Sequence, residues 1–248
     1  MARMRILTAN EQGVFDKPPL FDHRERKQFF SLPKGLMDIS ATLRTPGGRI
    51  GFLLMCGYFK ATKRFYPPRD FHERDIVFAA HQLNLANESF NSEAYAETTR
   101  LRHQRCILEF YGFAPFDKTA RKVLVTEIAT MARMYLKPRL IFDRCVDFLI
   151  QRRMQGPTAR SLTDMIRSGL HERKAELVVL MDDRLTDGTR NLLDGLFTAP
   201  DDQNRYRLTL LKKLSQSTKP TRIKEGVADS EMLAALYGQL EDILSVLD

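Results

Sequence analysis

The 248-residue chain is 43% apolar and 28% charged, which is typical of a folded globular protein with one large or two smaller domains and excludes a disordered tail. Its formal net charge of +8 comes entirely from residues 1–155, which hold 26 Lys and Arg against 16 Asp and Glu, whereas residues 156–248 hold 13 against 15. Such an excess suits a polyanion such as nucleic acid or an anionic membrane face, although many ordinary proteins carry a similar one.

Apolar residues at helical spacing run through the first part of the chain and predict short helices. A helix over residues 25–30 is expected to lead into Ser31, Leu32 and Pro33. Pro33 suits the first turn of a second helix that reaches about Leu43, with Ser31 as its N-cap. The segment Thr45–Gly48 breaks this pattern and separates these helices from the next one.

The next predicted helix begins apolar near Arg49, carries Gly57 on its apolar side, and ends at Pro67–Pro68. Its last turns carry three cations at spacings of three and four: Lys60, Lys63 and Arg64. On a continuous helix these residues share one face, which would hold them at fixed positions for DNA phosphates. A solvated, charged helix end is the alternative interpretation.

Two further helices are predicted after the prolines. The first is amphipathic and begins near Asp70, which is a good N-cap. The second lies within residues 91–113 and has an acidic start, a basic middle and an apolar patch before Gly112. Arg and Gln are the residue types that read guanine and adenine edges in the major groove. The candidate DNA contacts of the basic middle are Arg100, Arg102, His103, Gln104 and Arg105. A surface of salt bridges is the competing explanation.

Asp117 is expected to cap a long helix that ends at Lys137–Pro138, where another helix begins. That helix closes with two arginines, and Gly156–Pro157 turns the chain into a new helix near Thr158. This order fits a helix-turn-helix outline, although a structural helical hairpin would give the same pattern. The predicted DNA contacts are Arg152, Arg153, Thr158, Arg160, Ser161, Thr163 and Arg167, with Arg121, Lys122 and Arg139 as further candidates.

The last part of the chain is less basic. Residues 199–204 and 215–222 are predicted polar loops, and a final helix over residues 229–248 has leucines at spacings of three and four. This helix is expected to pack on other helices or on a partner. Because no segment has a convincing strand pattern, we predict an all-α fold, a multi-helix bundle with two helical DNA-binding modules.

Sequence motifs for catalysis and metal binding are missing. The segment Thr45–Gly51 lacks the Lys–Ser/Thr of a phosphate-binding loop, and no Gly-x-Ser-x-Gly occurs. The five histidines lack metal-ligand spacing, and the three cysteines form no Cys-x-x-Cys pair. No apolar run is long enough for a membrane span. We therefore predict a cytoplasmic protein that is not an enzyme, binds no cofactor, metal or membrane, and keeps its cysteines buried.

Four segments carry a resemblance to a known family: ILTANEQGVFDKPP, RKQFFSLPKGLMDISATLRTPGGRIGFLLMCGYFKATKRFY, TRLRHQRCILEFYGFAPFD and LKPRLIFDRCVDFLIQRRMQGPTARSLTDMIRSGLHERKAEL. In this order, over residues 5–198, the chain resembles the N-terminal region of Tn3-family transposases. The resemblance implies helical domains that bind the terminal inverted repeats of a transposon. The acidic triad of the family's RNase H-like catalytic domain lies further along the family's sequence and is not expected in this chain.

These observations together predict three parts. Residues 1–135 form a first helical DNA-binding domain, residues 136–198 a second that is helix-turn-helix-like, and residues 199–248 a helical tail that begins the following domain. The expected partner is double-stranded DNA at the transposon ends, with a homodimer through the C-terminal helices or through further domains. The alternative is a helical interaction or dimerisation module that does not itself read DNA.

Overall fold

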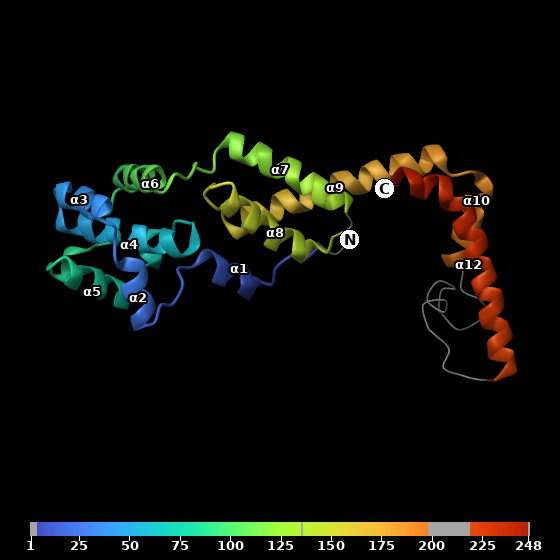
Figure 1. The fold of residues 1–248 in the computed structure, drawn as a ribbon, viewed down its shortest axis with the longest axis horizontal. Helices are drawn as coiled ribbons and strands as arrows, with labels where there is room; N and C mark the ends of the chain where they lie inside the picture. Colours follow the sequence, from blue (N-terminus) through green and yellow to red (C-terminus); the bar gives the residue numbers. More distant parts are fainter. Residues whose placement is uncertain (1–3, 135, 198–218, 248) are drawn as a thin grey trace. The chain divides into compact units, whose positions relative to one another are not determined.

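The structure, a computed structural model, describes residues 4–134, 136–197 and 219–247 (Figure 1). In these ranges the regular elements are helices, and one isolated backbone bridge joins Ala114 to Met154. The prediction of an all-α, multi-helix fold is confirmed. The chain divides into two compact units, residues 1–171 and 172–248.

One hydrophobic core of the first unit, called here the first core, is built around a central helix. Its helices are α2 (His23–Phe30), α3 (Lys34–Thr42), α4 (Pro46–Thr62), α5 (Glu73–Gln82) and α6 (Glu97–Tyr111). In α4, 11 of the 17 residues are buried, because the run from Ile50 to Phe59 is apolar on every side. A helix of this kind needs neighbours all round. The helices α2, α3, α5 and α6 all pack against it.

Gly57 allows α2 to approach α4 closely. A Cβ atom at this position would lie 2.1 Å from the ring of Phe30, a distance that no real contact tolerates. Phe30 is itself fully buried and packs edge-on against Tyr58. The glycine on the apolar side of this helix is therefore a packing requirement.

A buried ion pair ties three of these helices together. The Nε atom of Arg26 in α2 lies 2.6 Å from Oδ1 of Asp75 in α5, and the hydroxyl of Tyr58 in α4 donates to Oδ2 at 2.6 Å. The side chain of Asp75 is fully buried, and that of Arg26 is 14% exposed. Burial, and then Asp75, raise the pKa of Tyr58 well above its ordinary value, so this hydroxyl stays protonated.

Several predicted helix ends are confirmed. The Asp117 side chain accepts from the Ala120 amide at 2.9 Å and caps the helix α7 (Lys118–Arg133), and Gly112 ends α6 in the left-handed conformation (φ +65°). Two predicted caps are wrong. Ser31 ends α2, while Pro33 precedes α3 without a side-chain cap, and Asp70 lies in a short 3-10 turn, so that α5 starts after His72.

A second core of the first unit holds Ile6 and Leu7 with the buried faces of four helices. Three of these are α7 (Lys118–Arg133), α8 (Pro138–Gln151) and the start of α9 (Ala159–Arg184), while α1 (Ala9–Asp16) contributes the partly buried Phe15. The sequence predicted a domain boundary after residue 135. In the structure α7 lies before this boundary and α8 after it, and the two helices pack against each other. The change from one core to the other lies at residues 113–116, because Phe113 packs on the first core and Phe116 on the second.

The second unit holds the end of α9, α10 (Asp187–Phe197) and α12 (Pro220–Leu247). The predicted final helix is confirmed, but it starts at Pro220, within the segment predicted as a polar loop. Of its leucine positions, Leu233 is described and is 41% exposed. The predicted loop at residues 199–204 lies outside the described residues.

Candidate nucleic-acid interface

The three cations at the end of α4 do not share a helical face as their spacing predicted. The helix ends at Thr62, and Lys63 takes a left-handed conformation (φ 58°) that turns the chain away before Arg64. The helix therefore stops several residues before the prolines. The prediction of one rigid cationic face at this position is wrong, because the periodicity assumed a continuous helix.

Each of these three cations donates to a main-chain carbonyl of the protein. Lys60 Nζ lies 2.6 Å from the Gln28 oxygen and 3.3 Å from that of Ser31, at the end of α2. Lys63 Nζ lies 2.6 Å from the Lys60 oxygen, and Arg64 donates to the Phe15 oxygen. Cations at helix ends satisfy carbonyls that have no partner within the helix. In the structure these three side chains therefore stabilise the fold by binding main-chain carbonyl oxygens.

Burial acts on the charges of this cluster as well. It lowers the pKa of Lys63, with the Lys60 ammonium as a second cause. Burial also lowers the pKa of Arg64, while the charges of Tyr66 and Asp16 act in the opposite direction. A half-buried cation that already has an internal partner must give up that partner to neutralise a phosphate.

In α6, Arg102 and Arg105 match the predicted arrangement. Both are exposed, and within the described residues neither has a hydrogen bond or an ion pair. The opposite face holds Ile107 and Leu108 in the first core, which fixes the helix. Two cations three residues apart on an anchored helix have the fixity that DNA recognition requires.

The other residues of this helix that were predicted to contact DNA are paired, buried or half-buried. Arg100 is paired with Glu97, with its Nε 2.8 Å from Oε2, and Gln104 is half-buried. His103 is 2% exposed, so the prediction that it contacts DNA is wrong. Its Nδ1 is hydrogen-bonded to the Tyr95 hydroxyl, and its ring packs edge-on against Phe52. The basic run around this histidine predicts a surface residue, but its position in the helical period faces the core.

Burial of His103 makes stability depend on pH. Burial, and then the Arg102 charge, lower its pKa to about 4, below the ordinary histidine value of 6.5. The unfolded chain thus binds more protons between these values, and we expect the free energy of unfolding to fall as pH drops from 6.5 to 4. Urea unfolding of the wild type and of His103→Gln over this range measures the effect. The variant should have the shallower dependence; equal slopes would contradict the assignment.

In the α8–turn–α9 segment, residues 152–158 separate the two helices. Arg152 is exposed and lies over the Phe148 ring at 5.4 Å, while Arg153 has a left-handed backbone and lies 3.5 Å from the Tyr111 oxygen. The turn is held by Ala114, whose amide donates to the Arg153 oxygen at 2.8 Å and whose oxygen accepts from Gln155 at 2.9 Å. This turn is longer and more firmly tied than the predicted Gly–Pro turn.

Among the DNA contacts predicted at the start of α9, three residues are at least partly exposed, and two are buried or ion-paired. Thr158 and Arg160 are exposed, and Ser161 is half-buried. Thr163 is 1% exposed and donates to the Arg160 oxygen at 3.0 Å, so its predicted DNA contact is wrong. Arg167 is occupied by Asp164 at 2.7 Å and by the Met4 oxygen at 3.2 Å.

The first turns of α7 carry further exposed cations that are candidate phosphate contacts. Lys118, Arg121 and Lys122 are exposed at spacings of three and four, and within the described range none has a charged partner. Sequence reasoning passed over Lys118, although its position directly after the cap Asp117 was a usable signal. Arg139, in contrast, is bound to Asp143 at 3.2 Å and to Glu11.

Three neighbouring segments therefore present one group of exposed cations. The Ala114–Met154 bridge brings the turn at residues 152–155 beside the segment that joins α6 to α7, as Figure 1 shows. The set comprises Arg102, Arg105, Lys118, Arg121, Lys122, Arg152 and Arg153. In the described part of the chain no three His, Cys, Asp or Glu side chains are grouped to hold a metal ion. Nor is any described helix long and apolar enough to cross a membrane.

Comparison with known proteins gives one family. Residues 6–169 match the family described as a domain of unknown function, DUF4158, and no curated protein matches the chain. The match includes both cores of the first unit and every segment that carries the exposed cations. Because it covers well over half of the sequence, the chain belongs to the DUF4158 family.

Proposed function

We propose that this protein binds the terminal inverted repeats of a transposon in a sequence-specific manner, as the end-recognition part of a Tn3-family transposase. The observation that carries the proposal is the pair Arg102 and Arg105, exposed and without partners in the described residues, on a helix whose other face is buried. The resemblance of residues 5–198 to that family supports it. The basic charge of residues 1–155 points to the same class of partner.

Recognition on this proposal has two components. The cations of α7 and of the turn at Arg152–Arg153 neutralise phosphates and release counterions, which fixes the position of the protein on the duplex. Arg102 and Arg105 on α6 contact base edges, since one arginine guanidinium can donate two hydrogen bonds, to O6 and to N7 of the same guanine. Strand cleavage is not assigned to this chain, and a metal-dependent nicking assay would detect it.

Binding to the inverted-repeat duplex should depend steeply on salt. With five or more phosphates neutralised, affinity is expected to fall by at least about a hundredfold between roughly 50 and 200 mM salt. Fluorescence anisotropy with the transposon's own end duplex measures this fall, and a scrambled duplex of equal length and composition is the control. An affinity that stays flat with salt, or that is equal for the two duplexes, would remove the proposal.

An interaction module is the second candidate function, and the second unit contains the observation that favours it. Val178 and Val179 in α9 and Val227 and Tyr237 in α12 are at least half exposed. A contiguous patch of exposed apolar side chains is typical of a partner-binding surface. Sedimentation of the protein with and without DNA separates the candidates, because a dimerisation module would self-associate without nucleic acid.

A further inference from the structure

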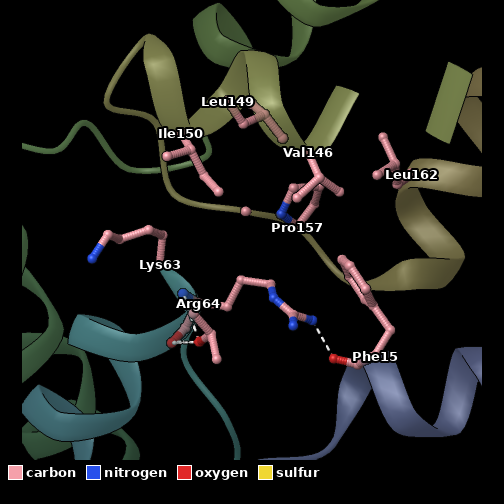
Figure 2. Close-up of a pocket in the computed structure, with 10 residues that line it drawn as sticks. Phe15, Lys63, Arg64, Val146, Leu149, Ile150, Pro157 and Leu162 are labelled. Carbon is pink, nitrogen blue, oxygen red and sulfur yellow. Dashed lines mark hydrogen bonds between the residues drawn. The ribbon is translucent and has the colours of Figure 1, made fainter. Parts of the chain in front are cut away.

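Arg64 joins the two cores of the first unit. The chain itself passes between the cores at residues 16–21 and 113–116. Arg64 follows directly on α4, the central helix of the first core, and its side chain reaches Phe15 of the second core, 49 residues earlier in the sequence. Figure 2 shows the guanidinium directed at Phe15, while Lys63 extends away from it.

The contact between Arg64 and Phe15 has two components. The guanidinium carbon lies 3.6 Å from the centre of the Phe15 ring, and NH1 donates to the Phe15 carbonyl oxygen. Phe15 in turn packs edge-on against Phe142 of α8, with ring centroids 5.1 Å apart. A planar guanidinium can stack and donate at the same time, which a lysine ammonium cannot do.

The stem of Arg64 also meets the segment before α9. A Cβ atom at Gly156 would lie 2.7 Å from Cγ of Arg64, so the glycine leaves room for the arginine. The Gly156 amide donates to the Lys63 oxygen at 3.2 Å. Val146, Leu149 and Pro157 line the same site, and the space left there is about 10 Å³, which is at the limit for one water molecule.

This arrangement assigns Arg64 a role other than DNA contact. Placing a cation in a partly buried site costs free energy of desolvation, which lowers its pKa, and an apolar side chain would avoid that cost. A guanidinium with a stacked ring and an oriented carbonyl gives the contact a direction that an apolar side chain does not provide. The Arg64 contact therefore links the two cores through one directional interaction.

We propose that Arg64 is a positioning residue: it fixes the second core against the first and so sets the spacing between the two parts of the DNA site. The inference rests on the proposed function for its DNA part. The first core carries Arg102 and Arg105, and the second carries Lys118, Arg121 and Arg152. Two DNA-binding surfaces held rigidly relative to each other fit one spacing between the two parts of the DNA site. Two surfaces that can move relative to each other fit several spacings.

The first test measures the relation of the cores without DNA. Nitroxide labels are placed at Asp38→Cys in α3 and Asp147→Cys in α8, both exposed, with the partly exposed Cys106 changed to Ser. Pulsed electron resonance then gives the distance distribution between the cores. We expect one narrow distribution with Arg64 present and a broad one in Arg64→Met, which keeps the apolar stem but loses the guanidinium. Arg64→Lys should give an intermediate width.

The second test measures spacing on DNA. Two base pairs inserted between the two footprinted parts of the end duplex turn one part by about a fifth of a helical turn. The wild type should lose affinity at least tenfold on this duplex, whereas Arg64→Met should bind both duplexes within about threefold of each other. Arg24→Met, an exposed arginine on α2 with the same change of charge, is the matched control and should behave as the wild type.

Each outcome decides one claim. A narrow distance distribution in Arg64→Met, or equal broadening in Arg24→Met, overturns the positioning role. Equal discrimination between the duplexes by the wild type and Arg64→Met overturns the spacing role. If the wild type has no preference for the end duplex, the proposed function fails, and the distance measurement alone then decides the role of Arg64. Circular dichroism of each variant identifies any that has unfolded. If Arg64→Met is unfolded, the comparison of the wild type with Arg64→Lys decides both tests in its place.

Discussion

Replacing Asp75 with alanine is expected to lower the free energy of unfolding by about 3–5 kcal/mol, which is the usual cost of removing one partner of a buried ion pair. The variant leaves the Arg26 guanidinium, 14% exposed, without its carboxylate. It also leaves the Tyr58 hydroxyl without the acceptor that now lies at 2.6 Å. Urea unfolding followed by circular dichroism measures the change.

The matched control for this stability prediction is Arg74→Ala. Arg74 is the neighbour of Asp75 on α5, but it is exposed and has no ion pair within the described residues. Its replacement should change the free energy of unfolding by about 0.5 kcal/mol or less. If Asp75→Ala cost no more than this control, the three-helix network would not be a determinant of the fold.

Reversing two charges on α6 should have the largest effect on DNA binding. We expect the double variant Arg102→Glu and Arg105→Glu to weaken binding to the inverted-repeat duplex by about a hundredfold or more, since each lost bidentate base contact costs about 1–3 kcal/mol. New carboxylates beside the phosphates add repulsion. Because neither arginine has an internal partner in the described structure, the fold should be unaffected. Anisotropy titration measures the affinity, and thermal melting monitors the fold.

A matched pair of residues lies on α2 for comparison. Arg24 and Lys27 are also three residues apart, exposed and without charged partners in the described residues. Reversing both changes the net charge by the same amount, and it should weaken binding far less than the α6 variant. Equal losses would mean that total charge, and not α6, controls the affinity. A changed oligomeric state in the α6 variant would instead favour the interaction module.

The local helical pattern could be predicted from the sequence because its causes are local. The Asp117 cap, the Gly112 stop and the apolar run of α4 depend on residues within a few positions of each other. The placing of Arg102 and Arg105 on the outer side of an anchored helix followed from the same periodicity. These features are fixed by backbone geometry and by the need to bury apolar side chains.

The end of α4 shows what sequence periodicity could not determine. Whether the chain continues as a helix after Thr62 depends on Lys63 adopting a left-handed conformation, which tertiary contacts stabilise. The acceptors of Lys60 and Arg64 lie 32 and 49 residues earlier in the chain. Long side chains reach whichever carbonyl the packing brings near, so the free cations cannot be told from the occupied ones by spacing alone.

The sequence by itself therefore determined that this protein is helical, where several of its helices begin and end, and which part of it is basic. Only the tertiary structure decided that His103 and Thr163 face the interior, and that α7 belongs with α8 across residue 135. It also separated Arg102 and Arg105, which are exposed, from Arg64, which is held between the two cores. The physical reason is range: helix formation depends on neighbours in sequence, whereas burial and the partners of a charge depend on segments that only folding brings together.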